Sequence, residues 1–286
     1  MIDLPDTASA EVETSLDLDA YCARIGYTGP REATLETLHG LMQAHSQTIP
    51  FENLDPLMGR PIRLDVPSLF DKLVQQRRGG YCFEQNGLFL AVLETIGFDV
   101  VPLSARVRIG WPRDIVTPRT HMCLRIEIEG QSYLADVGVG GLSLTSALML
   151  KLDQHQPTPH ETRRIIKEGD VHYHQVQFGS EWQDVYELTL EPMPLIDREV
   201  GNWYTSTHPE SRFRNVLMVA RAAPEGKRLT IMNDEFSIRA ASGEATKTSI
   251  ESKQQLLSIL DEHFGVTLDH EVPLKVPGIA WLTDGV

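Results

Sequence analysis

The period of the apolar residues changes at about Gly97, and this change favours folds that place helices before strands. Before Gly97, apolar residues recur at intervals of three and four, as in 35–45, which is typical of amphipathic helices. After it they alternate with other residues, as in 101–109 and 122–128, which is typical of half-buried strands. The order predicts an α+β chain whose helical part comes first.

Local signals indicate where several helices begin and end. Asp65 is a suitable N-cap with Pro67 just inside its helix, and Pro30 suits the first turn of another. Gly97 stands where a C′ residue belongs. Helices are expected at 18–25, 30–45, 65–74, 82–96 and 252–263, strands at 101–109, 122–128, 133–137, 172–178, 185–190, 216–220, 229–232 and 236–240, and a long loop at 150–162.

The composition excludes several classes of protein. With 286 residues, 41% of them hydrophobic and 23% charged, the chain can bury a core and is not mainly disordered. Its 40 acidic and 26 basic residues give a net charge of −14, which argues against nucleic-acid binding. No apolar run is long enough to span a membrane, and 1–16 looks like a loose acidic tail rather than a signal peptide. Three cysteines cannot build a disulfide framework, so we expect a reduced, cytoplasmic protein. From the net charge and the absence of a long apolar run, we expect no nucleic-acid or membrane partner.

Cys82 is the strongest candidate nucleophile. It ends the run RGGYC at 78–82 and is expected to begin a helix. Glycine permits an unusual turn that aims the thiol outward, and the partial positive charge at a helix N-terminus stabilises a thiolate. The alternative is that Cys82 is a small, buried apolar residue. Cys22 and Cys123 lack this context and are weaker candidates.

A base and an acidic partner for this cysteine are expected on one hairpin. If 129–130 is a two-residue turn, Ile128 faces Gln131. His121 and Asp136 are then diagonal neighbours on one face, with Cβ atoms roughly 7–8 Å apart. Asp136 would orient the imidazole ring, and His121 would pair with the thiol. The alternative is a surface histidine and an unrelated acid beside the turn.

Two weaker signals point to ligands. The glycines of 138–141 could form a phosphate-binding loop, but no clear helix follows them and the full fingerprint is missing. His172 and His174 would share one face of a strand and could bind a metal ion. With no third ligand in view, we expect both histidines to be exposed and no metal to bind.

Together these motifs resemble those of the arylamine N-acetyltransferases. They occur in that family's order from about residue 17 to about residue 145, and the spacing of the cysteine, histidine and aspartate is highly specific in combination. The motifs are RIGY at 24–27, IPFENLD at 49–55, RGGYCFEQN at 78–86, RTHM at 119–122 and DVG at 136–138, with weaker similarity in NWY at 202–204 and SRF at 211–213.

The resemblance implies an α+β fold with a cysteine-protease-like Cys-His-Asp core. Its catalytic triad would be Cys82, His121 and Asp136. The implied domains are a helical bundle with the nucleophile at 1–97, an antiparallel β-barrel with the histidine and aspartate at 98–205, and an α/β lid at 206–286.

The resemblance also implies a reaction. The Cys82 thiolate would take an acetyl group from acetyl-CoA and pass it to an arylamine, arylhydroxylamine or hydrazine, with His121 handling the proton. Acetyl-CoA would be a co-substrate, and no permanently bound cofactor is expected. The substrate and CoA pocket would be lined by Phe51, Thr120, Gly138, Val139 and Phe213.

Val139 departs from the family pattern, which usually has an aromatic residue at this position. Similar enzymes use that aromatic ring as a pocket wall, so valine is expected to widen the pocket and to alter the acceptor preference. By the same resemblance, Glu52 and Arg78 would form an ion pair behind the nucleophile. The alternative is that they are two unrelated surface charges.

Three other functions remain open. The chain could be a related amide synthase or acyltransferase that uses another acyl thioester. A papain-like thiol hydrolase has the same chain order of cysteine, histidine and carboxylate, but leaves the motifs at Arg24, Ile49 and Arg119 unexplained. A non-catalytic binding protein would have a structural Cys82, whose thiol would be inert to alkylation near pH ~6, unlike an activated thiol. The oligomeric state is left undetermined.

Overall fold

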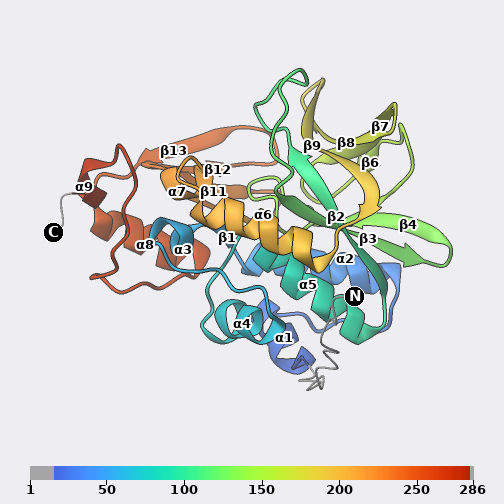
Figure 1. The fold of residues 1–286 in the computed structure, drawn as a ribbon, viewed down its shortest axis with the longest axis horizontal. Helices are drawn as coiled ribbons and strands as arrows, with labels where there is room; N and C mark the ends of the chain where they lie inside the picture. The colour runs from blue at the N-terminus through green and yellow to red at the C-terminus, as the bar shows by residue number, and fades with distance from the viewer. Residues whose placement is uncertain (1–15, 284–286) are drawn as a thin grey trace, which may run out of the picture.

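The computed structural model describes residues 16–283, so the predicted acidic tail at 1–16 lies almost wholly outside the described residues. Figure 1 shows a layer of helices, a strongly curved sheet on one side, and a second sheet with the C-terminal helices on the other. The predicted α+β architecture, with helices before the barrel strands, is confirmed.

The first helices begin where side-chain caps favour them. Asp17, Thr34 and Asp65 each accept a hydrogen bond from the backbone N–H three residues ahead, at 2.9, 3.3 and 3.0 Å. Gly97 ends α5 in the left-handed conformation, with φ 101°, as predicted. The helices of this part are α1 (Leu18–Ile25), α2 (Leu35–Thr48), α3 (Leu54–Leu57), α4 (Val66–Phe70), the π-helical turn η1 (Asp71–Gln75) and α5 (Cys82–Ile96).

The predicted start of α2 is wrong. The helix begins at Leu35 rather than near Pro30, because Thr34 caps it. Pro30 lies in the preceding turn, where its carbonyl accepts a hydrogen bond from the Tyr27 hydroxyl at 2.8 Å. A proline suited to a first helical turn is equally suited to an ordinary turn, and the cap decides between the two.

The central sheet has eight antiparallel strands in the order β5-β4-β3-β2-β9-β8-β7-β6 and curls into a nearly closed barrel (Figure 1). The β3–β4 hairpin has the predicted register, with Ile128 opposite Gln131 and Leu124 opposite Ala135. The strands are β2 (Asp99–Val107), β3 (His121–Ile128), β4 (Gln131–Ala135), β5 (Leu148–Met149), β6 (Gln156–Pro157), β7 (Thr162–Glu168), β8 (Val171–Phe178) and β9 (Glu181–Pro192).

β7 is missing from the predicted strands, and the short β6 lies within the expected loop at 150–162. The sequence of β7, TRRIIKE, is too charged to show an apolar alternation. Arg163 is nevertheless fully buried, because its guanidinium pairs with Glu161 at 2.8 Å. Tertiary pairing therefore overrides the local pattern here.

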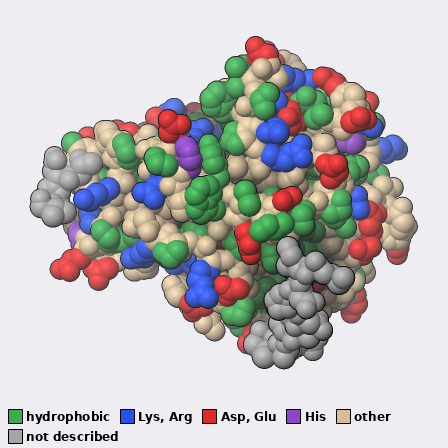
Figure 2. Space-filling model, viewed as in Figure 1, with side chains coloured by type: hydrophobic (Ala, Val, Ile, Leu, Met, Phe, Trp, Pro, Cys, Tyr) green, Lys and Arg blue, Asp and Glu red, His purple; other side chains and the backbone are tan. Residues whose placement is uncertain are grey.

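α6 (Leu195–Thr207) is also missing from the prediction. Ile196, Val200 and Trp203 are each more than half exposed, so its apolar residues do not mark a buried face. Figure 2 shows hydrophobic side chains on the region of the surface that α6 occupies in Figure 1. The helix is held in part through Asn202, whose Nδ2 donates to the Ile62 carbonyl at 3.1 Å.

The second sheet has the order β1-β10-β11-β12-β13 and packs on α8 around a separate hydrophobic core. Its edge strand β1 comes from the N-terminal part of the chain, which joins the helical layer to the C-terminal part. The remaining elements are β1 (Phe51–Glu52), α7 (Arg212–Asn215), β10 (Met218–Ala222), β11 (Arg228–Met232), β12 (Glu235–Arg239), β13 (Ala245–Ser249), α8 (Lys253–Phe264) and α9 (Ala280–Thr283).

The domain boundaries at 97/98 and 205/206 stay a prediction. The first falls directly before β2, and the second lies inside α6. Among residues 16–283, no helix is long and apolar enough to cross a membrane.

Asn53 connects the N-terminal part to the segment that leads into β10. Its Nδ2 donates to the carbonyls of Phe213 and Val216 at 2.9 and 2.7 Å, and its Oδ1 accepts from the Met218 N–H at 2.8 Å. The side chain is fully buried. These three bonds join segments more than 150 residues apart in the sequence.

We predict that Asn53→Ala lowers the free energy of unfolding by about 2–4 kcal/mol, because it leaves buried backbone groups without partners. Urea unfolding followed by circular dichroism measures this loss. Asn215→Ala is the control, since the Asn215 amide bonds only to nearby carbonyls of Pro209 and Ser211. A loss for Asn53→Ala no larger than that of the control would contradict the assignment.

Candidate active site

The loop before Cys82 is held against the N-terminal strand β1. A Cβ on Gly79 would lie 2.1 Å from the Pro50 carbonyl oxygen, so only glycine fits there without movement of the backbone. The Glu52 N–H donates to the Gly80 carbonyl at 3.0 Å, and the Gly80 N–H donates to the Pro50 carbonyl at 3.3 Å. The loop therefore reaches α5 in a fixed position, with Cys82 as the first residue of the helix.

A buried ion network supports this loop from behind. Arg78 pairs with Glu52 at 2.7 Å and with Asp55 at 3.2 Å, which confirms the predicted Glu52–Arg78 pair. Lys72 bridges Asp55 and Glu84 at 2.7 and 2.6 Å. Burial raises the pKa of Glu84 to about 7, although Lys72 opposes the shift.

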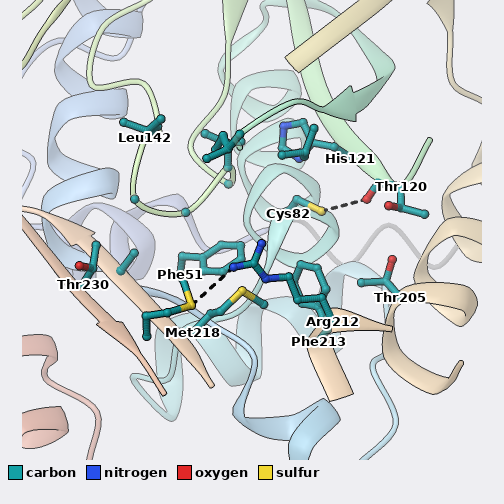
Figure 3. A pocket seen from close by; sticks show the side chains of 18 of the residues that line it. Phe51, Cys82, Thr120, His121, Leu142, Thr205, Arg212, Phe213, Met218 and Thr230 are labelled. Atoms are coloured by element: carbon teal, nitrogen blue, oxygen red, sulfur yellow. Dashed lines mark hydrogen bonds between the residues drawn. The ribbon is translucent and has the colours of Figure 1, made fainter. Parts of the chain in front are cut away.

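Cys82 lies at the positive end of α5 and lines a cavity of about 650 Å³. Its thiol donates to the carbonyl of Thr120 at 3.5 Å (Figure 3), and it interacts with His121 closely enough to raise the pKa of that imidazole. The residue is 3% exposed, yet its side chain faces the cavity rather than the core of the helical layer. Cys22 and Cys123 are also buried, but they do not line this cavity.

His121 and Asp136 lie together on the predicted hairpin. His121 Nε2 is 2.7 Å from Asp136 Oδ2, which leaves Nδ1 as the ring nitrogen for Cys82. The two side chains are 2% and 0% exposed, so the alternative of a surface histidine is excluded. The structure thus brings the three residues together, with Cys82 and His121 lining the cavity and Asp136 buried behind His121.

Asn86 is a site residue that our sequence interpretation missed. It lies one turn after Cys82 on α5, and its Nδ2 donates to Asp136 Oδ1 at 2.9 Å. Its Oδ1 accepts the Val137 N–H at 3.0 Å. A polar residue one turn after the cysteine on a largely apolar helix is the signal that could have found it.

The electrostatics of His121 favour its protonated form. Burial alone would lower the pKa of His121, but the Asp136 carboxylate and hydrogen bonds to Asp136 and Cys82 outweigh it and raise the pKa to about 10. One face of the ring packs on Tyr186, with centroids 5.1 Å apart. The imidazole is therefore oriented and can share its charge with the thiol.

All five predicted pocket residues line the cavity: Phe51, Thr120, Gly138, Val139 and Phe213. Gly138 packs tightly on the helix start, since a Cβ there would lie 2.9 Å from Cys82 Cα. The glycines after it line the cavity and are not followed by a helix, so they do not form a helix-bound phosphate loop. The lining residues that the prediction missed include Trp111, Tyr204, Thr205, Arg212, Met218 and Thr230.

The expectation that both histidines of β8 are exposed is wrong: His172 is half-buried, and the larger departure is at His174. This side chain is fully buried, with its ring 4.7 Å from that of Tyr186. Burial and the neighbouring Arg163 lower its pKa well below the ordinary value. Among residues 16–283, no group of three or more His, Cys, Asp or Glu side chains is placed to hold a metal ion.

The chain is similar to the proteins of one family over most of its length. The sequence model of a family described as N-acetyltransferase matches residues 34–272. An arylamine N-acetyltransferase from Mycolicibacterium smegmatis is 42% identical over 260 residues, which cover 89% of this chain and 93% of that protein. One from Escherichia coli strain K12 is 39% identical over 252 residues, covering 88% and 89%.

Solved structures give the same result. That of the arylamine N-acetyltransferase from M. tuberculosis has a TM-score of 0.85 at 40% identity and covers 87% of this chain and 94% of its own. That of the Mycobacterium marinum arylamine N-acetyltransferase in complex with CoA has a TM-score of 0.84 at 39% identity, covering 87% and 93%. The chain therefore belongs to the arylamine N-acetyltransferase family.

Proposed function

We propose that this enzyme moves an acetyl group from acetyl-CoA through a Cys82 thioester to arylamines, arylhydroxylamines or hydrazines. One observation carries the proposal: Cys82 opens into the cavity from a helix N-terminus, with the buried His121–Asp136 pair beside it. The CoA complex of the M. marinum relative supports acetyl-CoA as the donor.

In the first half-reaction, the Cys82 thiolate attacks the carbonyl carbon of acetyl-CoA. The new sulfur–carbon bond forms as the bond to the CoA sulfur breaks, and the proton on His121 passes to the departing CoA thiolate. The raised pKa of His121, about 10, favours the charged imidazole that supplies this proton. The developing oxyanion needs hydrogen-bond donors, and the backbone N–H of Cys82 at the start of α5 is one candidate.

In the second half-reaction, the amine nitrogen attacks the acetyl carbon on Cys82. His121, now neutral, takes the proton from the amine, and the Cys82 thiolate leaves. Asp136 keeps the ring oriented in both directions of proton transfer. Each substrate therefore uses the same cavity in turn.

Val139 supports a wide acceptor range. Its side chain lines the cavity where family members usually have an aromatic ring, which removes a stacking surface and leaves more room. The wider cavity also favours a bulkier acyl thioester as the alternative acyl donor to acetyl-CoA. The three free cysteines and the use of a thioester fit a reduced, cytoplasmic compartment.

We predict that acetyl-CoA alone adds one acetyl group to the protein, on a peptide that contains Cys82. Intact-mass and peptide mass spectrometry measure the adduct, and adding an aniline should discharge it. Cys82→Ser should abolish labelling, whereas Cys22→Ser should not alter it. If the wild-type protein gains no acetyl group although Cys82 is rapidly alkylated, acetyl-CoA is not the donor, and longer acyl thioesters and hydrolase substrates become the candidates.

We predict that Asp136→Asn reduces acetyl transfer by roughly 10²- to 10⁴-fold, because the amide neither orients the ring nor stabilises its charge. The pKa of His121 should fall, so alkylation of Cys82 at neutral pH should slow. Stopped assays and iodoacetamide kinetics measure both effects. Asp184→Asn is the control, since that carboxylate pairs with Arg113 outside the cavity. Unchanged alkylation in folded Asp136→Asn protein would show that another group orients the histidine.

A further inference from the structure

The charged side chains around the cavity are mostly cationic, although the whole chain carries −14. Arg212, Arg228 and Arg239 line the cavity, and Glu210 is the one carboxylate residue among its lining residues within 16–283. A local excess of positive charge in a concave site attracts anionic ligands. The three arginines differ in how far they are already neutralised.

Arg228 and Arg239 are held by a buried carboxylate. Glu161 accepts from Arg228 Nη2 at 2.7 Å and from Arg239 Nη2 at 2.6 Å, and it also pairs with Arg163 at 2.8 Å. Arg228 donates in addition to the Ser143 carbonyl at 2.8 Å. These two guanidinium groups therefore tie β11 and β12 to the chain before β7 and form part of the cavity wall.

Arg212 has no such partner. It is exposed, and the one hydrogen bond of its side chain within residues 16–283 goes from Nη2 to the Met232 sulfur, at 3.6 Å. Among the described residues, no carboxylate oxygen, that of Glu210 included, lies within 4.0 Å of the Arg212 guanidinium group, the distance that defines an ion pair. A thioether is a weak acceptor, so most N–H donors of the guanidinium group remain available to bind a ligand.

The surroundings of Arg212 are apolar and near the nucleophile. Figure 3 shows its side chain beside Phe213 and reaching toward Phe51, below Cys82 in that view. Phe51 and Phe213 pack edge to face, with centroids 6.1 Å apart. Because these walls are apolar, they offer the guanidinium group no competing acceptor, so its N–H donors stay available to an anion.

We propose that Arg212 is the anion-recognition residue of this cavity and binds a carboxylate or phosphate group of a substrate whose reacting atom is at Cys82. The inference rests on the proposed acetyl transfer. The planar guanidinium matches both groups in a two-pronged hydrogen bond. The anion has two possible sources, the carboxylate of an acidic arylamine or the phosphates of CoA. The two half-reactions separate them, because each involves only one of these molecules.

The experiment compares an anionic and a neutral substrate in each half-reaction, for the wild type, Arg212→Gln and Arg212→Lys. Acetylation of Cys82 is measured with acetyl-CoA and with S-acetyl-N-acetylcysteamine, a thioester without phosphates. Discharge of the acetylated enzyme is measured with 4-aminobenzoate and with its methyl ester. Arg214→Gln is the control, because Arg214 lies on the same short helix but does not line the cavity.

Arg212→Gln should lower the second-order rate constant about tenfold or more for the anionic member of one pair, and change that for the neutral member about twofold or less. Loss with 4-aminobenzoate assigns the acceptor carboxylate, and loss with acetyl-CoA assigns the CoA phosphates. Arg212→Lys should retain part of the rate constant that is lost in Arg212→Gln, because lysine keeps the positive charge but lacks the planar, two-pronged guanidinium group.

Equal effects on both members of each pair, or the same loss in Arg214→Gln, would overturn the proposal. If neither thioester acetylates the wild type, the proposed function fails instead. Arg212 is then judged by calorimetric binding of CoA and of 4-aminobenzoate. Weaker binding of one of them to Arg212→Gln than to the wild type supports anion recognition, and equal binding of both refutes it.

Discussion

The buried ion pair between His121 and Asp136 is the interaction on which the rest of the site depends. Two charges removed from water are stable only where further hydrogen bonds satisfy them. Asp136 accordingly accepts hydrogen bonds from the Asn86 amide and the Gly138 N–H, both at 2.9 Å, besides that of His121. Because Asn86 belongs to the helix that begins with Cys82, the same carboxylate orients the His121 ring and fixes the helix of Cys82 against the barrel.

Cys82 is held from the other side by the N-terminal part of the chain. The close approach of Gly79 to Pro50 and the Arg78–Glu52 pair fix the loop that leads into α5. The strand β1 that contains Glu52 also pairs with β10, whose sheet supplies one wall of the cavity. The helical layer, the barrel and the second sheet therefore meet around Cys82, and each contributes part of the cavity.

Much of this arrangement could be predicted from the sequence, because it depends on local rules. The helical spacing of apolar residues and the glycine at position 97 indicated α5 and its end. The two-residue turn at 129–130 set the hairpin register and so placed His121 beside Asp136. What could not be predicted depends on contacts between distant segments. Arg163 can be buried because it forms an ion pair with Glu161, and this charged residue at a buried position prevents β7 from being recognised in the sequence. α6 was missed for a different reason, since much of its apolar surface faces solvent. Arg212 enters the cavity through a four-residue helix that has no pattern of its own.

NMR titration of the histidine side chains tests most directly whether His121 carries its charge through neutral pH. With ¹⁵N-labelled histidine in the wild-type protein, and His121→Gln to assign the signal, His121 should titrate with a pKa of about 10. Its ring should then be an imidazolium at pH 7, paired with Asp136 and placed to stabilise the Cys82 thiolate. A pKa at or below the ordinary value of about 6.5 would contradict this account.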